Sequence, residues 1–266
     1  MPANTTLNIT GLPAFNDNYL WLIDNGQAAV VVDPGDARPV LQALAQRGLQ
    51  LDSILVTHHH ADHIGGIDAL LQQYPVPVIG PADKRIPQLT RRVAENDRCT
   101  VLGTEARVIE VPGHTLHHIA YFIDRSDVFG APVLFCGDTL FAAGCGRVFE
   151  GSFAQMRQSL ATLRELPGST KIYCAHEYTL ANLAFASAVE PDNQALQQRI
   201  ATVKALRDAG QASVPSLMAD ERATNPFLRY DSAAVIASAQ QRQRAGDGHI
   251  DSDSVFAIIR QWKDSF

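Results

Sequence analysis

Residues 57–63 constrain this chain more than any other stretch, because they read Thr-His-His-His-Ala-Asp-His and follow directly on an apolar run. We predict that the apolar run is a buried strand and that the histidines stand where it ends. Residues two apart in an extended segment point the same way, so His58 and His60 can reach one metal ion together. Asp62 and His63 stand where the chain turns and can address a second ion. Imidazole nitrogen and carboxylate oxygen suit zinc, iron or manganese, so the stretch predicts a metal site.

Three later apolar runs also end in a side chain that can bind a metal ion. Each run is a predicted strand, and the side chains that follow are His114, Asp138 and His176. Open α/β proteins gather their ligands at the carboxyl ends of strands, along one edge of a sheet. We therefore expect these three side chains to join the first segment, which gives enough ligands for two metal ions.

The composition is typical of a globular chain and argues against nucleic acid and membranes as partners. Hydrophobic residues make up 46% and charged residues 19% of the 266 residues, which excludes a disordered or coiled-coil chain. The net charge of -6 is unfavourable for binding phosphate backbones or anionic lipids. The N-terminal stretch shows no secretory signal, and no apolar run approaches the roughly 18 residues of a membrane span. The four cysteines show no CxxC spacing, so we expect reduced thiols in a cytoplasmic protein, and we expect a monomer.

Strand and helix signals alternate through the first two thirds of the chain and then give way to helical periodicity. Predicted strands are 20–23, 28–32, 51–57, 107–111, 119–123, 133–136 and 171–174. Predicted helices are 40–49, 64–74, one that begins at the capping box of Ser152 and Gln155, one around 196–206, and a last one over 255–262. We predict an α/β domain over residues 1–178, followed by a smaller helical domain over residues 179–266.

The metal-ligand motifs resemble those of the metallo-β-lactamase superfamily, from about residue 15 to residue 178. The matching motifs are HxHxDH at 58–63, GHT at 113–115, GDTLF at 137–141 and the late His176. The resemblance implies an αββα sandwich, in which two β-sheets are flanked by helices. It also implies a division of the ligands: His58, His60 and His114 for one metal, Asp62, His63 and His176 for a second, and Asp138 as a bridge between both.

Such a ligand set implies hydrolysis without a serine or cysteine nucleophile. Two metal ions about 3.5–4 Å apart can share a water and lower its pKa towards about 7. The resemblance thus implies attack by a hydroxide that bridges two divalent ions, zinc foremost and iron or manganese as alternatives. It gives Asp62 and Asp138 catalytic roles as well as roles as ligands.

Finer motifs resemble the glyoxalase II (hydroxyacylglutathione hydrolase) family over almost the whole chain. They are NDNY at 16–19, FAAGCGR at 141–147, CAHEYT at 174–179 and ATNPFLR at 223–229. The resemblance implies hydrolysis of S-D-lactoylglutathione to D-lactate and glutathione, the second step of methylglyoxal detoxification. The alternative is another two-metal hydrolase of the superfamily, such as a lactonase. A di-iron reductase would need a flavin domain, and the net charge disfavours an RNA nuclease.

The same resemblance implies that the glutathione part is bound by Arg147, Phe149, Tyr178, Arg260 and Lys263. Glutathione carries two carboxylates, so its site needs cations. Arg260 and Lys263 are three residues apart and share one face of a predicted helix. An arginine there can bind a carboxylate through two hydrogen bonds, whereas a lysine offers a point charge.

Three positions depart from the pattern of the glyoxalase II family. Arg147 stands where many relatives have Lys, Phe149 stands where Tyr is common, and His117 stands where Gly is usual. None of these departures removes a metal ligand, so they bear on substrate affinity and not on reaction class. The remaining histidines are expected outside the ligand set: His59, His118 and His249.

Overall fold

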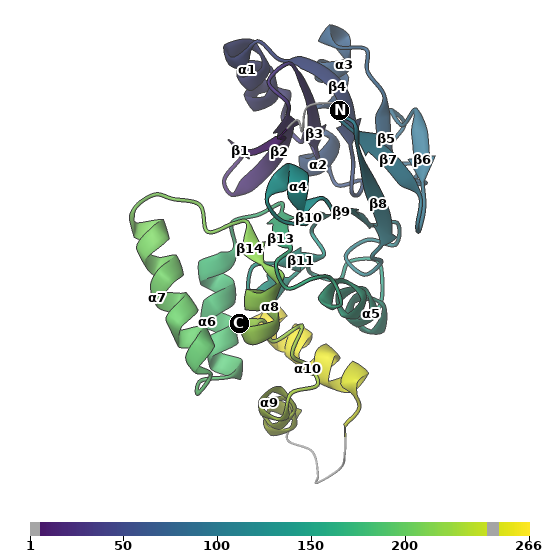
Figure 1. The fold of residues 1–266 in the computed structure, drawn as a ribbon. Helices are drawn as coiled ribbons and strands as arrows, with labels where there is room; N and C mark the ends of the chain where they lie inside the picture. The colour runs from purple at the N-terminus through teal and green to yellow at the C-terminus, as the bar shows by residue number, and fades with distance from the viewer. Residues whose placement is uncertain (1–5, 244–249) are drawn as a thin grey trace. The chain divides into compact units, whose positions relative to one another are not determined.

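The computed structural model describes residues 6–243 and 250–266, which form two compact units (Figure 1). Unit 1 comprises Met1–Glu110, His117–Gly137 and Lys171–His176. Unit 2 comprises Val111–Leu116, Asp138–Thr170 and Glu177–Phe266. His249, which we expect to be exposed, lies outside the described residues. Both units combine segments that are far apart in the sequence, so neither corresponds to one continuous stretch of the chain.

The first sheet of unit 1 is formed by the N-terminal strands. In spatial order they are β1 (Asn8–Ala14), β2 (Asn18–Asp24), β3 (Ala28–Val32), β4 (Gln50–Leu55), β5 (Val78–Pro81) and β6 (Arg91–Val93). The pairs β1–β2 and β2–β3 are antiparallel, whereas β3 to β6 run parallel. Helices α1 (Ala37–Arg47) and α3 (Ile67–Gln73) bury apolar residues such as Val40 and Leu70 in one core with Val31 and Ile54 of the sheet.

The second sheet of unit 1 contains, in spatial order, β13 (Lys171–Cys174), β10 (Val133–Gly137), β9 (Ile119–Ile123), β8 (Thr104–Glu110) and β7 (Arg98–Val101). The short helix α4 (Ser126–Phe129) connects β9 to β10. Strands β10 and β13 run parallel and pair Gly137 with Cys174 near their carboxyl ends. The two sheets are joined by Tyr121 of β9, whose hydroxyl oxygen lies 2.9 Å from the carbonyl oxygen of Val56 and 3.1 Å from that of Ile79.

The predicted helix over 64–74 is wrong as a single element. The chain forms α2 (Ala61–Ile64) and α3, separated by Gly65 and Gly66. The break has a packing cause, because the Gly66 amide donates to the carbonyl of Pro34 at 2.9 Å and a Cβ at this position would collide with backbone atoms. The glycine pair therefore lets the chain pass close to the loop that follows β3.

Among the described residues, unit 2 carries three short strands and most of the helices. Its elements are β11 (Leu140–Phe141), β12 (Gly144–Cys145), α5 (Phe153–Arg164), α6 (Thr179–Val189), α7 (Gln194–Asp208), β14 (Ser216–Leu217), α8 (Met218–Thr224), α9 (Ala233–Gln243) and α10 (Ser252–Ser265). The capping box at Ser152 and Gln155 is confirmed. The predicted C-terminal helix is also confirmed, as α10. None of the helices in the described part of the chain has the length and hydropathy needed to cross a bilayer.

Candidate functional site

The segment after β4 is held in place by Asp33, at the end of β3. One carboxylate oxygen of Asp33 accepts from the backbone amide of Thr57 at 2.7 Å, and the other accepts from the Thr57 hydroxyl at 2.7 Å. The same carboxylate lies 3.0 Å from Nδ1 of His63. Asp33 has φ 51, a conformation that costs free energy for a residue other than glycine. Asp33 thus anchors both ends of the histidine segment, at Thr57 and at His63.

His58 and His60 meet as the spacing predicts. His58 Nε2 lies 3.0 Å from His60 Nδ1. Two nitrogens bound to one tetrahedral ion would stand about 3.3 Å apart, given bonds of about 2.0–2.1 Å. The ring of His118 stacks on that of His58, with ring centres 4.5 Å apart and planes at 17°. His59 lies beside Asp83, with Nδ1 3.5 Å from a carboxylate oxygen.

One ligand group lies within unit 1 and consists of Asp62, His63 and His176, whose ligand atoms are all within 4.8 Å of one another. The Nε2 atoms of His63 and His176 stand 3.6 Å and 3.4 Å from Oδ2 of Asp62. On its other side, His176 Nδ1 lies 2.7 Å from the carboxylate of Asp17, and the side-chain amide of Asn18 donates to Asp62 at 3.0 Å. Carboxylates at Nδ1 fix these rings with Nε2 turned towards the group, which is the usual arrangement around histidine ligands.

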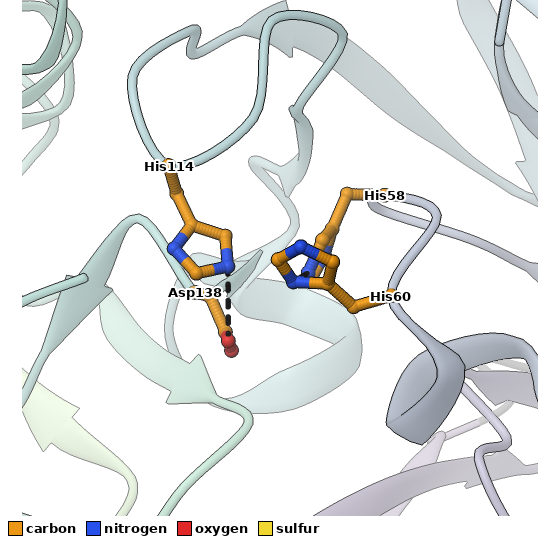
Figure 2. A group of neighbouring side chains, drawn as sticks. All are labelled: His58, His60, His114 and Asp138. Atoms are coloured by element: carbon orange, nitrogen blue, oxygen red, sulfur yellow. Dashed lines mark hydrogen bonds and ion pairs between the residues drawn. The ribbon is translucent and has the colours of Figure 1, made fainter. Parts of the chain in front are cut away.

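A second ligand group contains His58, His60, His114 and Asp138, whose ligand atoms also lie within 4.8 Å of one another (Figure 2). His114 Nε2 stands 3.4 Å from Oδ2 of Asp138. Its Nδ1 lies 2.7 Å from the backbone carbonyl oxygen of Arg147. A carbonyl oxygen can only accept, so the His114 proton belongs on Nδ1 and the lone pair on Nε2 faces the group.

The two groups fit divalent metal ions by their donor chemistry. They offer imidazole nitrogens and carboxylate oxygens, the donors that zinc and iron share. Four of the five histidines are buried, with His58 and His63 only 1% exposed. Burying histidines that face one another around a carboxylate costs folding free energy unless an ion or a proton holds the side chains together. The residues present can therefore bind metal ions at both groups.

All five residues predicted to bind glutathione lie in unit 2. The guanidinium of Arg260 is buried, donates to the carbonyl of Cys145 at 3.1 Å and stacks over the ring of Phe227. Lys263 donates to the carbonyl of Ala181 at 3.1 Å, and burial, together with the nearby Arg260, lowers the pKa of its ammonium group. Arg147 lies on the surface.

Two aromatic residues of this predicted set are exposed. Phe149 is 61% exposed and meets the ring of His114 edge-on at 5.3 Å between ring centres. Tyr178 is 38% exposed and meets Phe141 in the same way, also at 5.3 Å. His117, the third departure from the family pattern, is exposed as well.

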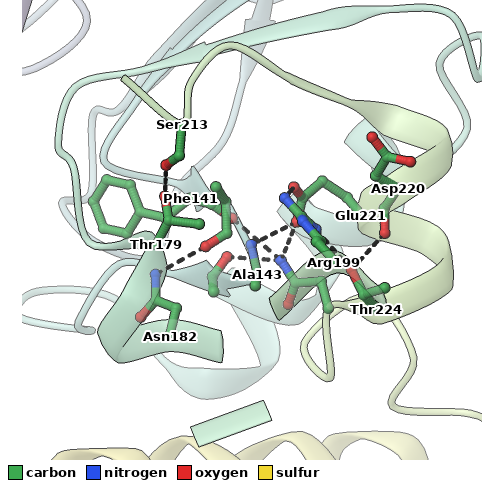
Figure 3. A network of polar contacts seen from close by, with 12 residues as sticks. Phe141, Ala143, Thr179, Asn182, Arg199, Ser213, Asp220, Glu221 and Thr224 are labelled. Carbon is green, nitrogen blue, oxygen red and sulfur yellow. Dashed lines mark hydrogen bonds and ion pairs between the residues drawn. The ribbon is translucent and has the colours of Figure 1, made fainter. Parts of the chain in front are cut away.

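A buried polar network, which no pattern in the sequence predicted, holds the turn between β11 and β12 (Figure 3). Glu221 is fully buried, and its carboxylate accepts from the amide of Ala143 at 2.8 Å, from the side chain of Asn225 at 3.0 Å, and from Arg199. The Asn225 amide group also donates to the carbonyl of Gly144 at 2.9 Å. The turn leads directly to the Cys145–Arg147 stretch, so helix α8 shapes the loop that carries a predicted substrate residue.

Asp17 and Asn18 were also missed as supports of the ligands. Their motif, NDNY at 16–19, indicates the family but not these contacts. The one signal in the sequence was a run of polar residues, 16–18, immediately before a strongly apolar strand.

Known proteins that resemble this chain match it from end to end. Residues 15–176 match the family model described as metallo-beta-lactamase superfamily, and residues 177–266 match the model described as hydroxyacylglutathione hydrolase C-terminus. A protein of Albidiferax ferrireducens named hydroxyacylglutathione hydrolase is 52% identical over 260 residues, which are 98% of this chain and 100% of that protein. The chain belongs to the hydroxyacylglutathione hydrolase family. A protein of the same name from Pseudomonas paraeruginosa is 49% identical, over 98% of this chain and all of its own length.

Solved structures agree with this assignment at the level of the fold. The structure of ETHE1 from Myxococcus xanthus has a TM-score of 0.62 at 22% identity, over 97% of this chain and 98% of that one. Another, described as being in a di-iron-bound form, has a TM-score of 0.51 at 27% identity, over 64% of this chain and 91% of that one. This member of the hydroxyacylglutathione hydrolase family thus has the predicted mixed α/β metallo-β-lactamase fold with a helical C-terminal domain.

Proposed function

We propose that this chain hydrolyses S-D-lactoylglutathione to D-lactate and glutathione, the second step of methylglyoxal detoxification. The observation that carries the proposal is the identity of 52% with a protein named hydroxyacylglutathione hydrolase, over 98% of this chain. The match of residues 177–266 to the C-terminal model of that family adds support, because the wider superfamily match stops at residue 176.

We propose the division of the metal ligands that the superfamily resemblance implies. His58, His60 and His114 would hold one ion, Asp62, His63 and His176 would hold the other, and Asp138 would be a ligand to both. The two ligand groups of the structure support this division, and the acceptors at Nδ1 of His63, His114 and His176 support binding through Nε2. Zinc is the foremost candidate, with manganese or iron as the alternatives; a structural relative described in a di-iron-bound form supports iron.

Divalent ions in these groups would supply an activated water at neutral pH and stabilise negative charge on the thioester oxygen. The side chains of this chain fix the geometry in which that chemistry takes place. Asp17 and Asp33 orient histidine rings, and Asn18 orients the carboxylate of Asp62. The chain therefore needs no general base of its own beyond Asp62 and Asp138, to which we assign the catalytic roles.

The glutathione part would be bound by residues of unit 2. Arg147, Arg260 and Lys263 supply positive charge for the glycine carboxylate, and Phe149 and Tyr178 offer exposed rings to the tripeptide. The substitution of Phe for the common Tyr at position 149 removes a hydroxyl, so we expect it to change substrate affinity and not the reaction.

We propose that residues 1–178 form the catalytic domain and residues 179–266 the glutathione-binding domain. The two family models meet between residues 176 and 177, which supports a functional boundary there. We further propose a cytoplasmic monomer that acts on a small molecule and binds neither nucleic acid nor membrane.

An assay for free thiol tests the proposal directly. Purified protein is mixed with S-D-lactoylglutathione at neutral pH beside a lactone and a β-lactam, and bound metals are measured in the same sample. We expect thiol release from the thioester and two metal ions per chain. Absence of thiol release from a sample with its metals intact would overturn the proposal, and turnover of the lactone alone would favour a lactonase.

A further inference from the structure

Asp264, in the last turn of α10, contacts both arginines that are assigned to glutathione. Its Oδ1 accepts from Nε of Arg147 at 3.1 Å and from Nη2 of Arg260 at 3.1 Å. Arg147 is 117 residues away in the sequence, in the loop after β12, whereas Arg260 is one helical turn away. One carboxylate oxygen therefore brings two guanidinium groups from separate elements together.

The two arginines differ in how firmly they are held. The side chain of Arg260 is only 5% exposed, and the Cys145 carbonyl and the Phe227 ring fix its guanidinium. The side chain of Arg147 is 56% exposed, and a long exposed side chain has many rotamers. Asp264 thus links the exposed side chain of Arg147, which has many rotamers, to the fixed side chain of Arg260.

The positive charges of Arg147 and Arg260 require a carboxylate between them. Two guanidinium groups that share one oxygen repel each other, and Lys263 adds a third positive charge on the same helix. The carboxylate of Asp264 offsets that repulsion and leaves the group of four side chains with a net positive charge. A further carboxylate, such as the terminal one of glutathione, is then still attracted.

We propose that Asp264 is a positioning residue, which holds Arg147 beside Arg260 so that both guanidinium groups are in place before the carboxylate of the substrate arrives. This inference rests on the proposed function. It defines the preferred substrates as thioesters with a free carboxylate at the glycine end. Ordering Arg147 in advance lowers the entropy cost of binding without touching the reacting atoms.

Substrates that differ only in this carboxylate test the inference. Asp264→Ala is assayed with S-D-lactoylglutathione and with its glycine ethyl ester, which lacks the negative charge at the glycine end. We expect KM for the free acid to rise about three- to tenfold, the range set by immobilising one long side chain, with little change in kcat. KM for the ethyl ester stays as in the parent protein. Asp264→Asn keeps one acceptor oxygen, so we expect a smaller rise.

Binding of S-methylglutathione, measured by calorimetry, gives a readout that does not depend on turnover. We expect Asp264→Ala to weaken binding of S-methylglutathione and to leave binding of its ethyl ester unchanged. Asp253→Ala is the matched control, because Asp253 is also on α10 and also pairs with an arginine, Arg157. It should bind both compounds as the parent protein does.

Two other outcomes would contradict the inference. A lower KM in Asp264→Ala would mean that Asp264 competes with the substrate carboxylate, and an equal rise for both substrates would mean a general structural role. If the parent protein releases no thiol, the proposed function fails, and the calorimetry still decides the role of Asp264.

Discussion

Two regions of this molecule bury charged side chains, and they use them differently. In the metal-ligand groups, histidine rings meet acceptors at Nδ1, and their Nε2 atoms lie near the carboxylates of Asp62 or Asp138. In the network around Glu221, the fully buried carboxylate accepts from a backbone amide, an asparagine and an arginine of its own unit. The first arrangement gathers lone pairs in one place, which is what an ion requires. The second pairs each acceptor with a donor, which fixes a loop.

Burial of charge alone therefore does not mark a functional site. The direction in which donors and acceptors point distinguishes a metal site from a network that holds the fold. Substitutions in the two regions should therefore separate loss of metal from loss of stability.

The largest effect is expected for Asp138→Ala. Asp138 belongs to the ligand group with His58, His60 and His114, so its loss removes an oxygen donor that we assign to both ions. Thioester hydrolysis should fall at least about a thousandfold, since a water without metal activation has a pKa near 15.7 in place of about 7. Metal analysis of the purified variant should show depleted ions. Asp127→Ala, at an exposed aspartate paired with Arg125, should keep both activity and metal.

The metal-ligand segment was predictable because its signal is local. The types of side chain and their spacing over residues 57–63 predicted that His58 and His60 meet, and strand ends predicted where the other ligands stand. Supports from distant parts of the chain left no such signal. Asp17 meets His176 across 159 residues, and the Ala143 amide meets Glu221 across 78. The spacing of residues along the chain does not reveal pairs that are so far apart in the sequence. The family motifs contain some of these residues, but the motifs do not indicate which residues contact one another.

The predicted helices and strands also fail where an element depends on contacts with distant parts of the chain. Apolar runs predicted the central strands, but the helix over 64–74 was wrong because the periodicity of its apolar residues does not reveal that Gly66 packs against the backbone near Pro34. The short strands β11 and β12 were missed, since the turn between them depends on Glu221 and Asn225 from elsewhere in unit 2. The helix α9 was missed as well.

The next effect in size concerns stability. Glu221→Gln removes the charge that faces Arg199, whose side chain is only 11% exposed. Breaking a buried pair in this way costs about 3–5 kcal/mol, so the free energy of unfolding in urea should fall by about that amount. Metal content per folded chain should stay unchanged. Asp220→Asn, at the exposed neighbouring position, should change stability by less than about 0.5 kcal/mol. A comparable loss of metal in Glu221→Gln would contradict the distinction between the two regions.

The smallest effect is expected for Asp17→Asn, and it tests the support of a ligand without removing any ligand. The asparagine keeps an oxygen near Nδ1 of His176 but removes the negative charge, so the ring becomes a weaker ligand. Metal affinity measured by competition with a chelator should fall about 10- to 100-fold, the usual range for partners that orient a histidine ligand. The side chain of Asp17 is 37% exposed, so the free energy of unfolding of the metal-free protein should change little. Asp124→Asn, on the surface after β9, should change neither quantity. Unchanged affinity combined with lower stability would place Asp17 with Glu221 as a residue that only holds the fold.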